Sequence, residues 1–503
     1  MSRRFLVVVL LAAATLFAGA EPARAAEIVP VSGVGSTWSA NAIDEWRRGV
    51  ASKNWTINYD PLGSSKGRSY FADGQSDFGV SEIPYGITDE GTKVADPPPS
   101  RKFVYMPIVA GGTAFMYNLK IGNDRVTNLR LSGETVAKIF TGNITSWDDK
   151  QIAEDNPQLR LPARPIVPVY RSDGSGTTAQ FTLWMSKEFP NLWHAFCKRA
   201  GRNENCGLTS QFPPGVIGTG AGGSAEAAGF VKQSSSEGAI TYVEYSYAVQ
   251  NQFPVAKIRN KSDYYIEPTA DAVAVALLKA RIRPDLTQEL DDVYHSEDKR
   301  SYPLSSYSYM ILPTALERGL DVNKGYSLAK FGYYLLCEGQ QKADVLGYSP
   351  LPINLVRSGL EQVAKIPGAV QEDIKIENCR NPTFSADSPN KLAETAAQPP
   401  ACDHFGKTQC ETGTGGLRKV TTKKKVTASG GPVAAGTASG GPNAEDVRDA
   451  SGESDVEASP VSLEADGGWR LRHTIMLLAA VLLCAVIVGP PLVSRRMRRG
   501  EDG

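Results

Sequence analysis

Short apolar runs and amphipathic stretches alternate along the first 385 residues. Continuous apolar runs, typical of buried strands, cover residues 103–108, 166–170 and 239–243. Apolar positions at helical spacing predict helices over residues 38–50, 133–140 and 221–232, the second of them capped by Ser132. This alternation favours an α/β fold in which ligands bind at the carboxyl ends of the strands.

Two longer apolar runs lie near the ends of the chain. The first follows Arg3 and Arg4 and precedes the small-residue cleavage site Ala23-Arg24-Ala25, so residues 1–25 are predicted to be a secretory signal peptide. The second, residues 474–493, is long enough to cross a bilayer and is followed directly by four arginines. The positive-inside rule therefore predicts a single-pass helix in the cell membrane, with the basic tail 494–503 in the cytoplasm and the rest outside.

A cell-wall sorting signal also consists of an apolar run and basic residues. No Leu-Pro-x-Thr-Gly pentapeptide precedes residues 474–493. A retained membrane anchor is therefore the favoured interpretation.

Composition divides the predicted exterior. Residues 27–385 carry recurring aromatic residues and turn signals and are long enough for two domains. A cysteine-containing extension covers residues 386–410. Residues 411–468 contain two Gly-Gly-Pro sequences and no aromatic residue, which predicts a flexible linker. The formal net charge is zero, so the sequence predicts no bulk attraction to nucleic acid.

Cysteine usage fits an oxidising compartment, because all cysteines except Cys484 lie in the predicted exterior. Sequence proximity suggests two pairs and leaves a third, although six cysteines allow many connectivities. The favoured pairs are Cys197–Cys206, Cys402–Cys410 and Cys337–Cys379. Zinc binding is the weaker alternative, because no Cys-x-x-Cys pair exists and only His194 and His404 lie nearby. No metal or other cofactor is predicted.

The sequence Arg-Ser-Asp-Gly-Ser-Gly-Thr-Thr at residues 171–178 has the parts of an oxyanion site. Arg171 is a planar, permanently charged donor, and Gly174 and Gly176 allow the backbone to turn its N–H groups inward. Ser175 and Thr177 add hydroxyls at the N-terminus of a predicted helix, where anions are stabilised. Taken alone, the motif also fits an ordinary turn before an amphipathic helix.

Three further polar segments with glycines stand at predicted element ends. They cover residues 33–38, 63–67 and 77–82. Each alone is a routine turn. Together with the Arg171 segment, they predict a ligand crevice between two lobes.

Nothing in the sequence indicates catalysis. The chain has four histidines, and none lies near a Ser or Cys in a recognisable nucleophile motif. His194, beside Trp193 and Phe196, is predicted to pack in the core, and His295, in a charged run, to lie at the surface. The chain is therefore predicted not to be an enzyme, and a phosphatase built on this fold is the least favoured of the alternatives.

In their order along residues 30–360, these motifs resemble the phosphate-binding proteins of bacterial ABC phosphate importers. The matching segments are residues 33–37, 63–65, 77–82, 131–149, 171–177 and 238–247. The resemblance implies a type II periplasmic-binding-protein fold with an interlobe ligand cleft. Lobe 1 is expected at about residues 27–115 and 246–385 and lobe 2 at about 116–245, with hinge crossings near 110–117 and 242–247.

The resemblance also implies the ligand set for inorganic phosphate. The implied residues are Thr37, the backbone of Trp38, Ser64, Glu82, Arg171, Ser175, Gly176 and Thr177, with Asp173 orienting Arg171. Fixed donors of this kind replace the hydrogen bonds that a dehydrated anion loses.

Glu82 departs from the family pattern, which usually has Asp at this position. Such a carboxylate accepts a hydrogen bond from protonated phosphate and repels a fully ionised anion such as sulfate. The additional methylene leaves three interpretations: the backbone is set back, the ligand or its affinity differs, or Glu82 turns to solvent or pairs with Lys66 or Arg68.

The sequence therefore predicts an extracytoplasmic, membrane-tethered phosphate-binding protein, with an ABC phosphate permease as the partner that the family implies. The alternative is a surface sensor or protein-interaction module that keeps the fold and has altered or lost oxyanion binding.

Overall fold

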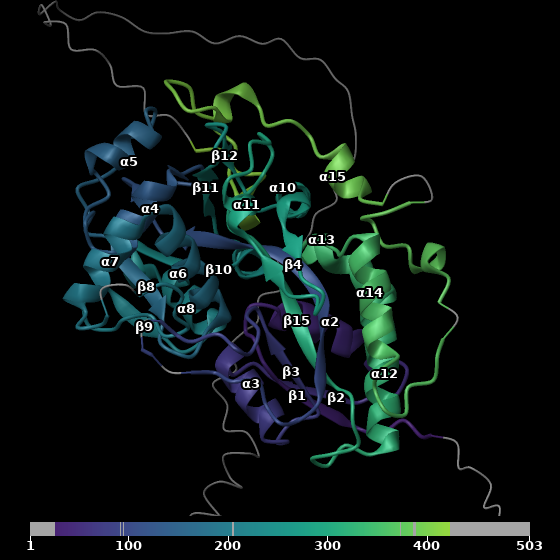
Figure 1. Ribbon diagram of the computed structural model, residues 1–503. Coiled ribbons are helices and arrows are strands. Elements are labelled where there is room, and N and C mark those ends of the chain that lie inside the picture. Colours follow the sequence, from purple (N-terminus) through teal and green to yellow (C-terminus); the bar gives the residue numbers. More distant parts are fainter. Residues whose placement is uncertain are drawn as a thin grey trace, which may run out of the picture. The chain divides into compact units, whose positions relative to one another are not determined.

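The computed structural model describes residues 26–422 except 91, 94, 204–205, 373 and 386–388 (Figure 1). The predicted signal peptide (1–25), most of the predicted linker (423–468), the predicted membrane helix (474–493) and the tail (494–503) lie outside the described residues. Among the residues that the structure describes, no helix is both long enough and apolar enough to cross a membrane.

An 11-stranded sheet runs through the molecule in the order β2-β1-β3-β15-β4-β10-β8-β9, and β11 joins β4 to β7 and β12. Its strands are β1 (Val31–Gly35), β2 (Ile57–Asp60), β3 (Phe78–Ser81), β4 (Phe103–Tyr117), β7 (Arg130–Leu131), β8 (Val167–Arg171), β9 (Thr219–Ala221), β10 (Ala239–Glu244), β11 (Val255–Arg259), β12 (Tyr265–Ile266) and β15 (Ser305–Pro313). Two short hairpins stand apart, β5 (Lys120–Ile121) with β6 (Asp124–Arg125) and β13 (Arg281–Ile282) with β14 (Gln288–Glu289).

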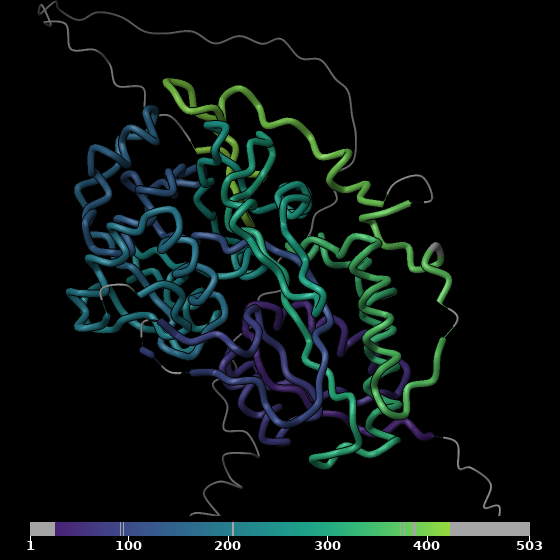
Figure 2. Tube along the Cα trace, in the orientation of Figure 1, coloured from purple at the N-terminus to yellow at the C-terminus, as the bar shows by residue number. Residues whose placement is uncertain are grey.

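One strand, β4, connects two parts of this sheet. Its residues Phe103–Gly112 pair with β15, and its residues Thr113–Tyr117 pair with β10, both antiparallel. We call β1, β2, β3 and β15 the first half-sheet, and β8, β9 and β10 the second half-sheet. Within each, the strands that carry the predicted polar segments run parallel, β1 with β2 and β3, and β8 with β9 and β10. The chain trace in Figure 2 shows β4 passing between the two parts.

Helices surround each half-sheet (Figure 1). Those that contact strands of the first half-sheet or its part of β4 include α2 (Ala40–Ala51), α3 (Ser64–Ala72), α12 (Val322–Leu336) and α14 (Ile353–Val363). Around the second half-sheet lie α4 (Gly133–Phe140), α5 (Lys150–Asp155), α6 (Gly176–Glu188), α7 (Pro190–Arg199), α8 (Ser224–Lys232) and α9 (Tyr245–Gln250). The remaining short helices are α10 (Ala270–Ala276), α11 (Asp291–Tyr294), α13 (Ala343–Leu346) and α15 (Lys391–Thr395).

Most sequence-predicted elements are confirmed, and one is wrong in part. The three apolar runs lie within β4, β8 and β10 apart from Ile166, and the first two predicted helices are α2 and α4. Ser132 caps α4 as predicted, because its hydroxyl accepts the Thr135 amide at 3.2 Å. The predicted helix 221–232 begins only at Ser224. Residues Thr219–Ala221 instead form β9, because they pair in parallel with β8 at the edge of the sheet.

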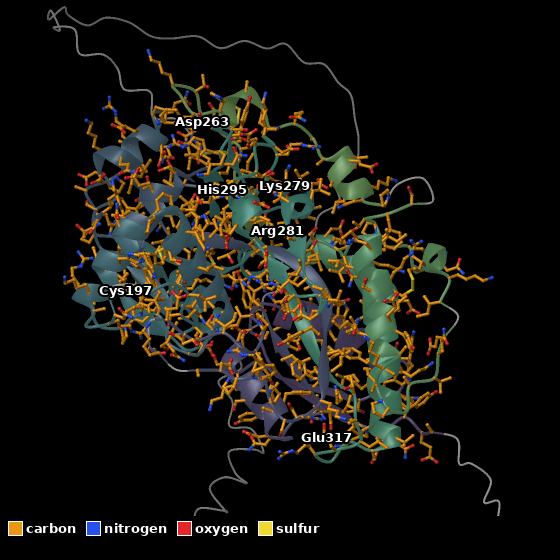
Figure 3. All side chains as sticks on the ribbon, in the orientation of Figure 1. Cys197, Asp263, Lys279, Arg281, His295 and Glu317 are labelled. Carbon is orange, nitrogen blue, oxygen red and sulfur yellow. A yellow bond between two sulfur atoms is a disulfide. The ribbon has the colours of Figure 1, made fainter. Side chains whose placement is uncertain are left out.

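The predictions for two histidines have different outcomes. His194 is not in the core: Trp193, Phe196 and Cys197 form the buried stripe of α7, and His194 stands at its half-exposed margin. His295 is exposed, as predicted, and its Nε2 lies 2.9 Å from a carboxylate oxygen of Glu188 (Figure 3).

The three predicted disulfides are confirmed. The pairs are Cys197–Cys206, Cys337–Cys379 and Cys402–Cys410. Since all six sulfurs are paired, none is a thiolate for zinc. Among the described residues, moreover, no cluster of three or more His, Cys, Asp or Glu is arranged to hold a metal ion.

The chain after residue 389 packs as a strap along the domain, and we call residues 389–422 the C-terminal strap. The Lys257 ammonium lies 2.6 Å from the Asp403 carboxylate, and the Val255 amide donates to the Thr414 hydroxyl at 3.0 Å. The hydroxyls of Thr422 and Thr127 are 2.9 Å apart. The sequence placed the start of the linker at residue 411, whereas these contacts hold the chain to residue 422.

Candidate functional site

Four helices begin where the two half-sheets face each other. Each follows the carboxyl end of a strand: α2 follows β1, α3 follows β2, α6 follows β8 and α8 follows β9. Hydrogen bonds join the N-terminal ends of these helices in pairs. The Thr37 and Ser224 hydroxyls, at the starts of α2 and α8, lie 2.8 Å apart, and the Gly176 amide of α6 donates to the Ser64 hydroxyl of α3 at 3.1 Å. Helix N-termini carry unpaired N–H groups and a partial positive charge, so their junction favours an anion.

Arg171, the last residue of β8, is the buried cation of this junction. Only 1% of its surface is exposed. Its Nε and Nη2 donate to the two carboxylate oxygens of Asp173 at 2.7 and 2.5 Å, and its Nη1 donates to the Ser224 hydroxyl at 2.9 Å. The bidentate contact fixes the plane of the guanidinium, so that the remaining N–H groups have a defined direction.

The first turn of α6 lies directly against the opposite half of the site. Ser175 caps the helix by accepting the Thr178 amide at 3.1 Å, and Thr177 is buried in the turn that follows. A Cβ atom on Gly176 would stand 2.1 Å from Glu82 Oε2 and 2.5 Å from the Ser64 hydroxyl. Any side chain at position 176 would therefore keep the two sides apart.

Glu82 points into the site rather than to solvent. It follows β3 and is 1% exposed. Ser308 donates to its Oε1 at 2.9 Å, Ser64 donates to its Oε2 at 2.7 Å, and the Ser36 hydroxyl also donates to Oε1. Of the three interpretations of Glu82, the one in which it turns to solvent or pairs with Lys66 or Arg68 is wrong.

Local packing explains the orientation of Glu82. Arg68 already forms an ion pair with Asp96, since its Nε lies 2.5 Å from a carboxylate oxygen of Asp96. Three serine hydroxyls donate hydrogen bonds to the buried Glu82 carboxylate. Burial raises the pKa of Glu82, while hydrogen bonds from Ser36, Ser64 and Ser308 and the charge of Arg171 act in the opposite direction. Glu82 is thus a carboxyl group whose proton affinity is increased at the point where an anion would bind.

The residues expected after β1 lie in the same region. Thr37 is buried with its hydroxyl against Ser224. The ring of Trp38 is buried, and its backbone amide, an implied ligand donor, donates to the Ser36 hydroxyl at 3.0 Å. The structure brings together all nine residues that the sequence analysis singled out.

Three serines of the site were missed by the sequence analysis. Ser224 opens α8 after Gly222 and Gly223, a local signal like that of the other segments, but it was hidden inside the predicted helix 221–232. Ser36 lay within a predicted motif and received no role. Ser308 lies on β15 next to a register shift between Ser308 and Tyr309, and no local motif marks it.

The site combines the cation Arg171, the carboxyl groups of Glu82 and Asp173, several hydroxyls and four helix N-termini. A carboxyl group beside a guanidinium suits a small oxyanion that still carries a proton, because the proton lets a carboxylate act as its acceptor. The described histidines lie elsewhere, His194 on α7, His295 beside Glu188 and His404 against the ring of Tyr264.

The fold and this site define a member of the PBP superfamily, whose domain model matches residues 19–338. At the level of sequence, the chain is 31% identical over 333 residues to the phosphate-binding protein PstS of Xylella fastidiosa, covering 65% of this chain and 83% of that protein. It is 32% identical over 326 residues to PstS 3 of Mycobacterium leprae, covering 63% and 82%. The chain belongs to the PstS family of phosphate-binding proteins.

Solved structures agree on the fold. A high-affinity periplasmic phosphate-binding protein, PfluDING, solved with bound phosphate, matches with a TM-score of 0.50 and 18% identity, covering 74% of this chain and all of that one. An ancestral soluble variant of the human phosphate-binding protein matches with a TM-score of 0.51 and 17% identity, covering 68% and 99%.

Proposed function

We propose that this chain binds inorganic phosphate at the junction of α2, α3, α6 and α8 and captures it for import. The observation that carries the proposal is the buried Arg171, held in a bidentate contact by Asp173 and close enough to the buried carboxyl group of Glu82 for its charge to oppose the rise in pKa that burial causes in that group. Membership of the PstS family supports the same ligand.

Each side of the site has a role in this proposal. Donors come from the guanidinium of Arg171, from the amides at the start of α6 and α2, and from hydroxyls. The hydroxyl donors are those of Thr37, Ser64, Ser175, Thr177 and Ser224. Glu82 accepts the proton of the bound phosphate, and this contact distinguishes phosphate from sulfate. In this interpretation Ser36 and Ser308 hold the longer side chain of Glu82 in place.

The finer organisation follows the family. The lobes, about residues 27–115 with 246–385 and about residues 116–245, close on phosphate around β4 and the end of β10. Residues 474–493 anchor the protein in the cell membrane through the linker, with the binding domain outside. An ABC phosphate permease receives the ligand. A module that has lost its ligand is not favoured, because Glu82, the residue that suggested it, is buried among site residues.

Calorimetry tests the proposal. The full chain, stripped of bound anion, is titrated with phosphate, arsenate and sulfate. Tight binding of phosphate and not of sulfate is expected, as is a loss of affinity of about 100-fold or more for Arg171→Ala, because a buried charge-assisted donor is removed.

Arg164→Ala is the matched control, since Arg164 is partly exposed and pairs with Glu237 outside the site. It should bind phosphate as the unsubstituted chain does. Absence of heat with every anion on folded protein, or unchanged affinity in Arg171→Ala, contradicts the proposal.

A further inference from the structure

The loop between β3 and β4 reaches from the first half-sheet to the second. Its base is fixed to α3 and β4, because the Tyr85 hydroxyl donates to the Arg68 carbonyl at 2.5 Å and the Tyr85 amide donates to the Tyr105 hydroxyl at 2.7 Å. The ion pair between Arg68 and Asp96 ties the returning arm of the loop to the same helix. A bridge between Thr88 and Ala95 pairs the two arms. The described residues of the loop are therefore attached to the first half-sheet on both arms.

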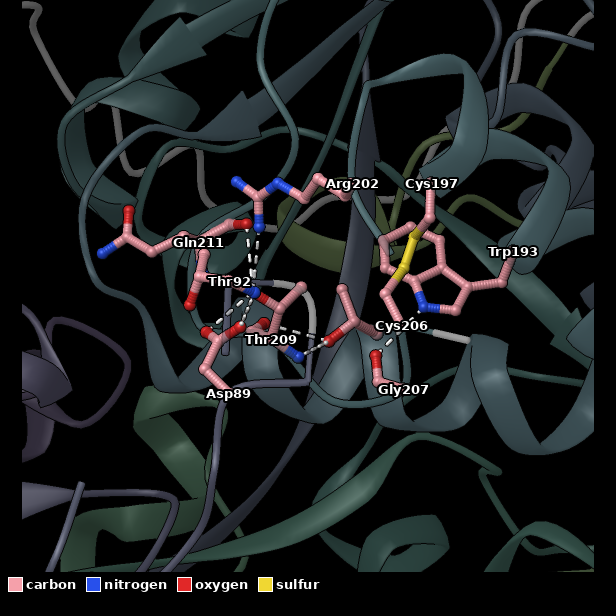
Figure 4. The surroundings of a disulfide bond; sticks show 10 residues. Asp89, Thr92, Trp193, Cys197, Arg202, Cys206, Gly207, Thr209 and Gln211 are labelled. Carbon is pink, nitrogen blue, oxygen red and sulfur yellow. Dashed lines mark hydrogen bonds between the residues drawn. A yellow bond between two sulfur atoms is a disulfide. The ribbon is translucent and has the colours of Figure 1, made fainter. Parts of the chain in front are cut away.

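The tip of this loop binds residues that precede β9. Asp89 Oδ2 accepts the Thr209 hydroxyl at 2.7 Å and the Ser210 amide at 2.9 Å (Figure 4). The Glu90 amide donates to the Leu208 carbonyl at 3.0 Å. The Ser210 hydroxyl also donates to this oxygen, at 3.4 Å, so one carboxylate oxygen gathers three donors from the other side of the site.

The receiving segment is itself firmly held. Cys206 is joined to Cys197 of α7, and the indole of Trp193 donates to the Gly207 carbonyl at 3.0 Å (Figure 4). Thr209 exchanges two hydrogen bonds with the Thr182 hydroxyl of α6, both at 3.0 Å. A contact made to this segment is therefore transmitted to α6, the helix whose first turn contributes to the site.

Two short steps connect Asp89 to the oxyanion donors. The amide of Ser175, the cap of α6, donates to the Ser210 carbonyl at 2.9 Å. The amide of Ser65, next to the site residue Ser64, donates to the Gly174 carbonyl at 3.0 Å. Apolar contact adds to the polar one, since Ile83 and Ile87 of the loop pack with Leu208.

We propose that Asp89 is a positioning residue: with the β3–β4 loop it forms a latch that holds the two half-sheets together over the bound anion and sets the rate of release. The inference rests on the proposed function. It follows from connectivity, since β4 links the half-sheets covalently on one side, whereas Asp89 links them by hydrogen bonds that separate when the halves part. A contact present only in the closed arrangement stabilises that arrangement and slows dissociation.

Release kinetics test the latch. Phosphate dissociation from the full chain is measured by stopped flow for the unsubstituted protein, for Asp89→Ala and for the control Asp124→Ala, an exposed aspartate of the hairpin β5–β6. Asp89→Ala is expected to release phosphate about 10- to 100-fold faster, as loss of charge-assisted hydrogen bonds implies, with association changed less than about threefold. The ratio of phosphate to sulfate affinity should stay unchanged, because Asp89 does not touch the anion.

A release rate within twofold of the unsubstituted protein overturns the latch, as does a changed selectivity ratio. Thr209→Val supplies the second test. If Asp89 acts through Thr209, the double variant Asp89→Ala/Thr209→Val accelerates phosphate release by less than the product of the two single-variant factors. Acceleration by the full product overturns the proposal.

Failure of the proposed function is recognised separately, by absence of phosphate binding in the unsubstituted chain. In that case the radius of gyration from small-angle X-ray scattering is the test of the latch. A larger radius in Asp89→Ala than in Asp124→Ala supports the latch, and equal radii overturn it.

Discussion

Glu82 is one methylene longer than the aspartate that the resemblance led us to expect, and its surroundings show how the longer side chain fits. The side chain extends from the end of β3 to the first turn of α6, where its Oε2 occupies the space that a Cβ on Gly176 would need. Hydroxyls of Ser36, Ser64 and Ser308 surround the carboxylate. The greater length is thus matched by a glycine opposite and by serines at the sides.

Glu82→Gln keeps this shape and removes the negative charge. The amide no longer repels a fully ionised anion, and its NH2 group donates where the carboxylate accepted. The ratio of sulfate affinity to phosphate affinity is therefore expected to be more than about tenfold higher in Glu82→Gln than in the unsubstituted chain. Competition calorimetry measures the ratio. A ratio equal to that of the unsubstituted chain would show that Glu82 does not distinguish a protonated anion from a fully ionised one.

Sequence reasoning reached most of the site residues that have a local signal. It missed Ser36 and Ser224, which have one, and Ser308, which has none. Arg171, Gly176 and Ser64 stand in short motifs where a strand ends and a helix begins. Ser308 lies 226 positions from Glu82, and only the pairing of β15 with β3, in which Tyr309 lies opposite Ser81, brings the two together. No spacing along the chain encodes such a contact.

At the scale of elements, the end of β10 and the start of α9 meet at the middle of β4. Glu244 pairs with Thr113 in the ladder, is fully buried, and accepts the Ser246 amide at 2.7 Å as the cap of α9. Burial raises the pKa of Glu244 well above its ordinary value. A proton is therefore held by the folded chain over a pH range in which the unfolded chain has lost it.

This predicts a pH dependence of stability. Between about pH 4.5 and the folded pKa, the native state binds one more proton than the unfolded state, so the free energy of unfolding falls as pH rises. Glu244→Gln should remove about 1 kcal/mol per pH unit from that slope. Part of the dependence of the free energy of unfolding on pH remains in Glu244→Gln, because the pKa of Glu82 is also raised. Urea unfolding at a series of pH values measures both, and identical slopes in the two proteins would contradict the prediction.

The order of elements was predictable because apolar runs and capping residues are local signals. The strand β9 was not, because its three residues Thr219–Ala221 contain no apolar run and owe their conformation to pairing with β8. The ordered course of residues 411–422 was hidden for a similar reason. Their composition resembles a linker, and only contacts with distant residues such as Thr127 and Val255 fix them.

At the scale of the whole molecule, three disulfides close loops of different length. Cys337 and Cys379 are separated by 42 positions, and Cys402 and Cys410 by 8. Because a cross-link restricts the unfolded chain more when it closes a longer loop, replacing the first pair by serines should cost about 4 kcal/mol and replacing the second about 3 kcal/mol. Guanidinium unfolding of the two double variants measures the order, and a larger cost for the shorter loop would contradict it.

The C-terminal strap also determines how the domain responds to mechanical force. A pull along the chain beyond residue 422 first loads the contact between Thr422 and Thr127, then the bonds of Thr414 to Thr127 and Val255. At Cys410 the force crosses the disulfide to Cys402, so the backbone of residues 403–409 is bypassed, and the ion pair of Asp403 with Lys257 is one of the contacts that hold this part of the strap to the domain. Peeling of the strap thus absorbs the load before it reaches β4 and the proposed anion site.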